Sequence, residues 1–348
     1  MIDSKDISIV VQGAIEKENT LHCLKSVMEY LPGAEIILST WKGSEIKGLP
    51  CDILIENDDP GAVIASPKFN YLNNINRQLV STVEGLKKCN KKFAMKIRSD
   101  NVLTSANFLD YFNKFPARCD KFKLFQSRAI VATLFSRKFF GIPTPFRISD
   151  WFMFGLAEDI KKFYFNITPI IEPAFSNYFA DDRLLELKGY PSPYHYHQYT
   201  TEQYYPLNCF QKFFPEIKMK DLADFNEENI TQSDICLANN FIFLEYKQHG
   251  IYTNKDKWNK WSLDEANSPD EHWDGFWRHY IFQKEYKKYC DSAYRLPLFD
   301  YRDLKRKFLN RLNHLKNNIY RKERKGELRT IIVLGIKFNY KRKPNKTE

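Results

Sequence analysis

The sequence predicts an α/β fold, with a Rossmann-type, mostly parallel sheet and helices on both of its faces. In the first hundred residues, short β-rich apolar runs alternate with segments whose apolar residues recur at helical spacing. The chain has 348 residues, 43% hydrophobic and 28% charged, which is the composition of a folded protein. Its 13 glycines and 16 prolines exclude collagen-like and low-complexity classes.

Four apolar runs in this region are predicted strands, at residues 7–11, 35–40, 51–56 and 92–99. A first helix is predicted where Leu21, Leu24 and Leu31 share one face, and Pro32 follows directly to end it. A second helix covers residues 74–88, where Ile75, Leu79 and Leu86 repeat at helical spacing. The order strand, helix, strand, strand, helix, strand is typical of a parallel sheet.

The middle of the chain is less regular. Residues 129–135 and 149–155 are predicted strands, and residues 141–146 are a proline-containing loop. Helices are predicted at residues 108–115, 157–163, 201–214 and 273–289. We therefore predict one domain over residues 1–300, with halves at 1–115 and 116–300, and a separate tail over residues 301–348.

The tail holds the positive charge of the chain. Residues 302–348 contain sixteen Lys or Arg and only four Asp or Glu, whereas the whole chain has a net charge of +10. Between Tyr301 and Ile319, apolar residues recur at steps of three and four, which predicts a basic amphipathic helix. Such a tail favours an anionic surface, either a membrane or a nucleic acid. Alternatively, the apolar stripe packs on the body and the basic face is only solvated.

Other features concern the compartment. The sequence has no run of 18 apolar residues, so no membrane-spanning helix is predicted. The first residues lack the basic and apolar regions of a signal peptide, so we expect a cytosolic protein. Seven scattered cysteines without a CxxC pair indicate reduced packing residues and not a disulfide framework or a zinc site.

The fourth predicted strand carries charge on one face. Because side chains alternate along a strand, Lys96, Arg98 and Asp100 point the same way, at the carboxyl end where α/β sheets bind ligands. The carboxylate can hold a divalent metal on a diphosphate, and the cations can meet phosphate. The alternative is a half-exposed strand with a solvated ion-pair face. No GxGxxG or GxxxxGK[ST] motif accompanies this pattern.

Two further segments can contribute to the same site. Gln12 and Gly13 follow the first strand, where a glycine allows close ligand approach and an amide can bond a base or ribose. Asn76 and Arg77 lie at the start of the second helix, where free N–H groups and a guanidinium suit an anion. A plain turn and an ordinary helix cap are the alternatives.

Two carboxylates are candidate general bases. Asp150 lies beside Trp151 and Phe152, which suits a sugar-binding pocket, and Glu202 opens the helix predicted at residues 201–214. Either residue can take a proton from an acceptor hydroxyl. The alternatives are a core aromatic patch with an Asp turn, and a first-turn Glu favoured by the helix dipole.

Seven short motifs, taken together and in order, resemble the WavE lipopolysaccharide synthesis family over about residues 5–250. They are Ile7-Ser-Ile-Val-Val-Gln-Gly13, Leu31-Pro-Gly-Ala-Glu-Ile-Ile-Leu-Ser-Thr-Trp41, Asn57-Asp-Asp-Pro-Gly61, Asn74-Ile-Asn-Arg-Gln78, Lys96-Ile-Arg-Ser-Asp100, Ser149-Asp-Trp-Phe152 and Thr201-Glu-Gln-Tyr204.

The resemblance implies a glycosyltransferase with the nucleotide-binding GT-A fold. The first half would bind a nucleotide-sugar donor, with Asn57 joining the residues named above, and the second half would bind the acceptor. The metal-binding DxD motif of GT-A enzymes is matched here by Ser99-Asp100-Asn101, so Asp100 is the one candidate ligand for Mn²⁺ or Mg²⁺. The acceptor would be a lipopolysaccharide or capsular glycan. The tail would hold the enzyme peripherally on the inner face of the cytoplasmic membrane.

Two other functions fit part of the sequence. A nucleotidyl- or phosphosugar-transferase would use the same donor pocket and leave a phosphodiester in its product. A nucleic-acid-binding protein would use the basic tail. The body is slightly acidic and the tail has no RNA-binding motif, so we expect no nucleic-acid partner.

Overall fold

The computed structural model describes residues 2–66, 71–171, 175–176, 178–179, 197–254 and 275–299, together with residues 304, 308, 311, 320–325, 328–333 and 336–341. The chain divides into two units. The first consists of Met1–Glu265 and His272–Leu296, and the second of Ala266–Glu271 and Pro297–Glu348.

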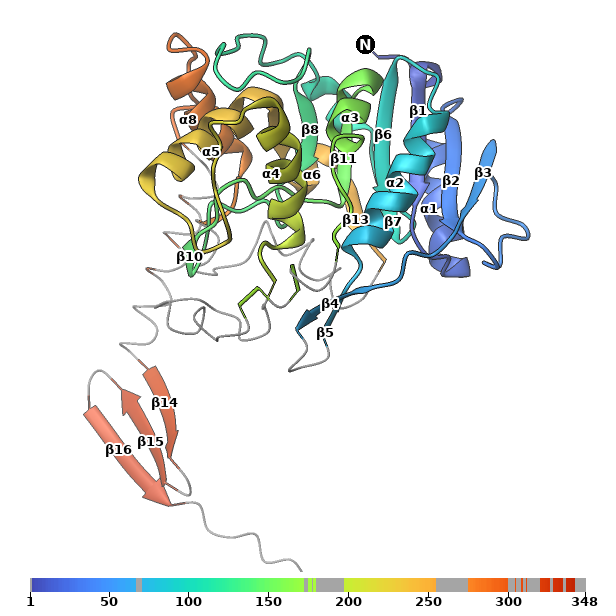
Figure 1. The fold of residues 1–348 in the computed structure, drawn as a ribbon. Helices are drawn as coiled ribbons and strands as arrows, with labels where there is room; N and C mark the ends of the chain where they lie inside the picture. The colour runs from blue at the N-terminus through green and yellow to red at the C-terminus, as the bar shows by residue number, and fades with distance from the viewer. Residues whose placement is uncertain are drawn as a thin grey trace, which may run out of the picture. The chain divides into compact units, whose positions relative to one another are not determined.

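A seven-stranded sheet forms the centre of the first unit, in the order β12-β8-β11-β6-β1-β2-β3 (Figure 1). All neighbouring strands are parallel except that β11 is antiparallel to both β6 and β8. This arrangement confirms the predicted mostly parallel α/β fold. The strands are β1 (Ile7–Gln12), β2 (Glu35–Trp41), β3 (Ile53–Asn57), β6 (Phe93–Arg98), β8 (Ala129–Ala132), β11 (Phe152–Leu156) and β12 (Phe241–Leu244).

The strand order reverses at β1. The chain runs from β1 through β2 to β3 at one edge, and then returns to place β6 on the other side of β1. Because parallel crossovers are right-handed, the helices of these two connections, α1 (Lys17–Tyr30) and α2 (Ile75–Lys88), cover opposite faces of the sheet. The reversal opens a crevice at the carboxyl ends of β1 and β6.

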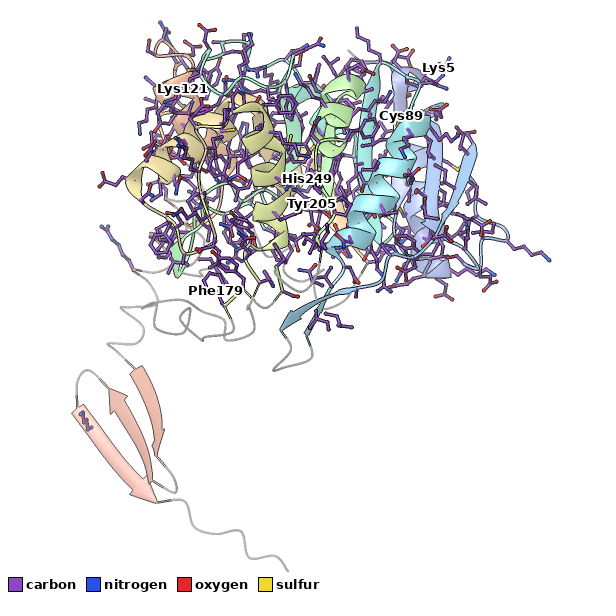
Figure 2. The ribbon with its side chains drawn as sticks, viewed as in Figure 1. Lys5, Cys89, Lys121, Phe179, Tyr205 and His249 are labelled. Carbon is purple, nitrogen blue, oxygen red and sulfur yellow. The ribbon has the colours of Figure 1, made fainter. Side chains whose placement is uncertain are left out.

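The core lies between the sheet and its helices. All six residues of β1 are buried, as expected for a central strand that is covered on both faces. Helix α2 packs closely on this strand, because a Cβ at Gly85 would overlap Val10 Cγ1. Helix α3 (Ala157–Tyr164) packs beside α2 and against β11. Tyr205 and His249 lie inside this packed body (Figure 2).

The second half of the sheet is supported by three further helices. A capping box between Thr200 and Gln203 begins α4 (Thr201–Phe213), and the Asn226 side chain caps α5 (Glu227–Asn240). Helix α5 leads directly into β12 and packs against α8 (His279–Tyr289). Neither α5 nor β12 was predicted. The predicted helix at 273–289 is described as a helix from His279 onward.

Several short elements complete the unit, and some differ from prediction. Residues 108–115 contain a short 3-10 helix in place of the predicted α-helix, and the predicted loop at 141–146 includes a paired strand. These elements are η1 (Ser4–Asp6), η2 (Asn107–Tyr111), α6 (Tyr246–His249) and the two-stranded pairs β4 (Val63–Ser66) with β5 (Tyr71–Asn73), β7 (Asn101–Leu103) with β13 (Ile251–Thr253), and β9 (Phe139–Phe140) with β10 (Ile142–Pro143).

The second unit contains an antiparallel sheet of β14 (Tyr320–Lys325), β15 (Leu328–Val333) and β16 (Ile336–Lys341). Of the predicted helix at 301–319, the structure describes three residues, and these are helical: Leu304, Phe308 and Arg311. The rest of that helix lies outside the described residues. The strands were not predicted, although the β-branched residues around Ile331 favour one.

Among the described residues, no helix is both long enough and apolar enough to cross a membrane. All seven cysteines are free thiols, as predicted.

Candidate functional site

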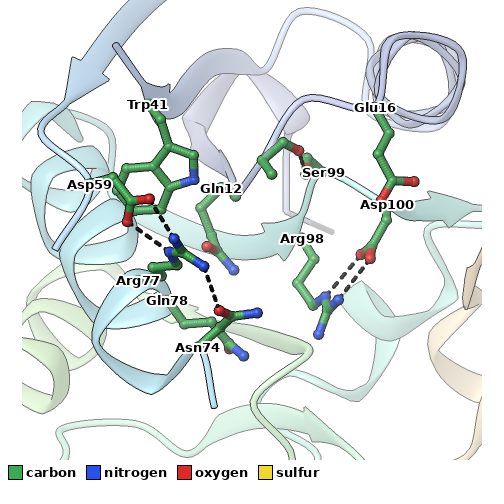
Figure 3. Close-up of a pocket in the computed structure, with 12 residues that line it drawn as sticks. Gln12, Glu16, Trp41, Asp59, Asn74, Arg77, Gln78, Arg98, Ser99 and Asp100 are labelled. Atoms are coloured by element: carbon green, nitrogen blue, oxygen red, sulfur yellow. Dashed lines mark hydrogen bonds and ion pairs between the residues drawn. The ribbon is translucent and has the colours of Figure 1, made fainter. Parts of the chain in front are cut away.

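A cavity of about 360 Å³ opens at the carboxyl ends of β1, β2 and β6, at the reversal of the strand order. Its volume falls within the roughly 300–1,000 Å³ of small-molecule sites. Polar and charged side chains dominate its wall (Figure 3). The lining residues are Gln12, Gly13, Ala14, Glu16, Trp41, Asp59, Asn74, Arg77, Gln78, Arg98, Ser99 and Asp100.

Backbone hydrogen bonds fix the floor of this cavity. The Gly13 N–H donates to the Ser39 carbonyl at 3.1 Å, and the Ser99 N–H donates to the Gln12 carbonyl at 2.9 Å. Ser99 Oγ also donates to the Ala14 carbonyl at 2.7 Å. Gly13 has a φ of +126°, and a Cβ there would lie 3.1 Å from Ser99 Oγ. Glycine is therefore required where the strand turns into the cavity wall.

Arg77 stands on one side of the cavity, in the first turn of α2. Its Nε and Nη2 donate to the two Asp59 carboxylate oxygens at 2.7 and 2.6 Å, and its Nη1 donates to Asn74 Oδ1 at 3.0 Å. The hydrogen bond from Arg77 lowers the pKa of Asp59, and the same bond raises the pKa of Arg77. Both groups therefore stay charged, and the loop after β3 is tied to the start of α2.

Arg98 stands on the other side, at the end of β6, and Gln12 lies between the two arginines (Figure 3). Arg98 Nε and Nη2 donate to the two Asp100 oxygens at 2.9 and 2.7 Å. The Asp100 side chain is only 7% exposed, whereas that of Arg98 is 26% exposed. Burial alone would lower the pKa of Arg98, but the adjacent carboxylates, Asp100 first, raise it. The guanidinium is therefore a permanent cation at this edge.

Three of the predicted donor-site residues have other partners and do not line the cavity. Lys96 is fully buried, its ammonium donates to the Asp150 carbonyl, and burial lowers its pKa to about 8. Asn57 Nδ2 donates to Ser39 Oγ at 3.0 Å and thereby joins β2 to β3. Asn76 exchanges two hydrogen bonds with the Ile170 backbone, at 2.8 and 2.9 Å. These side chains brace the structure around the site.

The predicted site residues that do line the cavity are Gln12, Gly13, Arg77, Arg98 and Asp100. Gln12 is itself held in place, because its Oε1 accepts a hydrogen bond from Ser81 Oγ at 2.7 Å. These are five of the twelve lining residues, and all of them except Arg77 follow from the rule that ligands bind at the carboxyl ends of strands.

Comparison with known families decides the broader assignment. Residues 7–314 match the WavE lipopolysaccharide synthesis family, and this segment includes every residue of the cavity. The chain belongs to this family. No match is found among curated proteins. Membership links this WavE-family protein to lipopolysaccharide synthesis and indicates a biosynthetic enzyme.

A divalent metal, which the fold family implies, does not fit the described residues of this WavE-family protein. Both Asp100 oxygens accept hydrogen bonds from Arg98, and the Ser99 hydroxyl is bonded to the backbone. Asn101 is fully buried and does not line the cavity. No group of three or more His, Cys, Asp or Glu suited to a metal occurs in the described part of the chain. Asp100 thus serves as the partner of an arginine.

The two candidate bases of the WavE-family chain have different surroundings. β11 pairs Phe152 with Ile97 of β6, so Asp150 comes beside the end of β6. Asp150 is 7% exposed, and no hydrogen bond joins its carboxylate to another described residue. Glu202, in contrast, forms an ion pair with Arg147 at 3.4 Å. Among the described residues, a cation thus bonds the carboxylate of Glu202 but not that of Asp150.

Sequence reasoning missed other lining residues, among them Trp41, Asp59 and Gln78. Trp41 is the last residue of β2, which lies next to β1 in the sheet. The rule that ligands bind at the carboxyl ends of strands therefore also predicts Trp41. Asp59 lies in the loop after β3 and is brought to the cavity by Arg77. Nothing in the local sequence signals that pairing across 18 positions.

Proposed function

We propose that this protein is a glycosyltransferase that moves a sugar from a nucleotide-sugar donor to a hydroxyl of a lipopolysaccharide or capsular polysaccharide acceptor. The observation that carries the proposal is the polar cavity at the strand-order reversal, with one arginine on each side (Figure 3). Membership of a lipopolysaccharide synthesis family supports the same reading.

On the donor side, Arg98 and Arg77 supply the positive charge for the diphosphate. Guanidinium groups suit this role because their planar N–H forks match phosphate oxygens. Trp41 offers an aromatic face for the nucleobase, as stacking on an indole is available to any base. Gln12, which lies between the two arginines, offers its side-chain amide to the same ligand.

On the acceptor side, Asp150 is the general base, ahead of Glu202. The acceptor oxygen bonds to the anomeric carbon while the bond from that carbon to the diphosphate oxygen breaks. The electron pair leaves with the nucleoside diphosphate, and the acceptor proton passes to the Asp150 carboxylate. Arg98, which lies close enough to Asp150 for that carboxylate to raise its pKa, stabilises the developing negative charge on the leaving group.

The test begins with a thermal-shift screen of the full chain against uridine, guanosine, cytidine and thymidine nucleotides and their sugars. A ligand at a hundred times its Kd stabilises the folded state by about 2.7 kcal/mol, which is readily detected. A donor that binds is then incubated with lipopolysaccharide precursors, and products are weighed by mass spectrometry.

A mass gain of one sugar, with release of the nucleoside diphosphate, is the expected result. A gain of one sugar phosphate, with phosphorus retained in the product, supports the phosphosugar-transferase alternative instead. If no nucleotide or nucleotide sugar shifts a protein shown to be folded, the transferase proposal is overturned.

A further inference from the structure

Arg98 is the centre of a small cluster of charges. Its guanidinium bonds both oxygens of Asp100, and the electrostatic fields of Asp150 and Glu16 also reach it. One partly buried cation therefore lies within electrostatic range of three carboxylates from three different segments of the chain. Such an acidic surrounding is typical of a bound metal ion, but here an arginine stands in its centre.

The pairing with Asp100 orients Arg98 without using all of its donors. A guanidinium has five N–H groups, and the two bonds to Asp100 use Nε and one hydrogen of Nη2. No hydrogen bond joins Nη1 to another residue in the described part of the chain. The exposed quarter of the side chain faces the cavity, so these remaining donors are available to an anion there.

A second source of positive potential lies opposite. The first turn of α2 borders the cavity through Asn74, Arg77 and Gln78, and no side chain caps that helix at Asn74. The N–H groups of this turn and the helix dipole favour an anion at this point. Asp59 is already neutralised by Arg77, and Glu16 is exposed to water, which screens its charge.

We propose that this protein binds the diphosphate of its donor without a divalent cation, and that Arg98, held in place by Asp100, occupies the position of that cation. Asp100 is then a positioning residue for the guanidinium and not a metal ligand. The inference rests on the proposed function, because it concerns how the same cavity holds a nucleoside diphosphate.

The first experiment measures binding of uridine, guanosine, cytidine and thymidine diphosphates to the full chain by calorimetry, once with excess EDTA and once with Mg²⁺ or Mn²⁺. The expected result is one nucleotide whose Kd with EDTA lies within about threefold of its Kd with metal. Binding that needs metal overturns this inference but leaves the proposed function intact. Absence of binding under both conditions overturns the proposed function and this inference with it.

Two substitutions separate the role of Asp100 from that of Arg98. Arg98→Gln removes charge-assisted hydrogen bonds and is expected to weaken binding in EDTA roughly ten- to hundredfold. Asp100→Asn keeps the shape of the side chain but removes the charge that orients the guanidinium, so binding in EDTA is expected to weaken by less than about tenfold, and added metal should not change that loss. A metal ligand would behave in the opposite way, and loss of binding in Asp100→Asn with little effect of Arg98→Gln contradicts the inference.

Lys161→Gln is the matched control for loss of a cation, since Lys161 lies on α3 in an exposed pair with Glu158, away from the cavity. Its nucleotide affinity is expected to equal that of the wild type. Thermal unfolding of each variant without ligand establishes that the protein is folded before its affinity is compared.

Discussion

At the scale of single residues, the two acidic candidates for proton transfer differ in their partners. Glu202 forms an ion pair with Arg147, and both side chains are less than one-fifth exposed. Asp150 is buried beside the end of β6. Burial raises the pKa of the Tyr164 and Tyr205 phenols, and the nearby Asp150 carboxylate adds to both shifts. Because no described side chain donates a hydrogen bond to the Asp150 carboxylate, its oxygens are open to an acceptor hydroxyl, whereas Arg147 occupies one oxygen of Glu202.

Asp150→Asn is therefore expected to lower kcat by about 10²–10⁴-fold, the usual contribution of a general base, while donor affinity stays near that of the wild type. Glu202→Gln is expected to cost less than tenfold in kcat. It leaves the Arg147 guanidinium without its partner and thus lowers the thermal midpoint. Steady-state kinetics and thermal unfolding of both variants check this. A greater kcat loss in Glu202→Gln than in Asp150→Asn would reverse the assignment.

Lys96 yields a prediction about pH. Burial lowers its pKa from 10.5 to about 8, so between these values the unfolded chain holds a proton that the folded protein has lost. The free energy of unfolding of the wild type, relative to Lys96→Met, is thus expected to rise from pH 8 to 10.5, by an amount on the order of 3 kcal/mol. Below pH 8 the difference is constant. Urea titrations at several pH values measure it, and a difference that falls or stays flat contradicts the lowered pKa.

The candidate site was only partly predictable from sequence, for a reason visible in these residues. Alternation along β6 correctly placed Arg98 and Asp100 at the cavity. The same alternation placed Lys96 on the same face of the strand, but it does not show how deeply a side chain is buried. Lys96 is covered by the chain around Asp150 and does not reach the cavity. The pairing of Arg77 with Asp59 depends on how the loop after β3 folds, and no local sequence pattern predicts it.

At the scale of elements, the contact between α2 and β1 sets the position of the helix that carries Arg77. Gly85 lets the helix approach Val10, so Gly85→Ala is expected to destabilise the protein by about 1–3 kcal/mol through overpacking, despite the better helix propensity of alanine. Chemical denaturation measures the change.

A double variant at Gly85 and Val10 tests whether the loss of stability comes from the overlap of these two residues. In the double variant Val10→Ala with Gly85→Ala, the added methyl group fills the space left by the valine. Its loss of stability is expected to be smaller than the sum of the two single losses. Lys88→Ala, on an exposed position of the same helix, should change stability by less than about 0.5 kcal/mol. Strict additivity of the pair would contradict the overlap.

Whether a helix could be predicted from the sequence depended on whether its buried face is apolar or polar. Helices α1 and α2 bury leucine and other apolar residues at regular spacing, and both were predicted. Helix α5 instead buries polar side chains, such as Gln232, Asn239 and Asn240. Asn240 accepts hydrogen bonds from two backbone N–H groups and donates to two carbonyls. A hydrogen-bonded face of this kind gives no apolar period, so α5 was missed.

At the scale of the whole molecule, charge is divided between body and tail. The sixteen Lys or Arg in residues 302–348 make this part strongly basic. We propose that it binds anionic lipid on the cytoplasmic face of the membrane, where a lipid-linked acceptor would be found, and that it binds no nucleic acid. Each basic residue near such a surface contributes about 1 kcal/mol.

A variant with four neutralised residues of β14 (Arg321, Lys322, Arg324 and Lys325, each to Gln) is expected to lose roughly tenfold or more of its binding to anionic vesicles in pelleting assays. Neutral vesicles should bind neither protein. A control variant neutralises four exposed lysines of the first unit and should bind like the wild type: Lys25, Lys87, Lys88 and Lys121. Equal loss in both variants, or a salt-sensitive gel shift with DNA or RNA, would contradict the proposal.

The antiparallel strand β11 has a consequence for how the chain folds as it leaves the ribosome. The strand is made after β8, yet it lies between β8 and β6 in the sheet. Residues 129–132 therefore have no neighbouring strand until residue 156 has been synthesised, and their second neighbour arrives only with residue 244. In contrast, β1, β2, β3 and β6 are neighbours in the sheet and are all complete once residue 98 has been synthesised. The half that carries Arg77 and Arg98 can thus assemble during translation, while β8 waits as an open edge for more than a hundred residues.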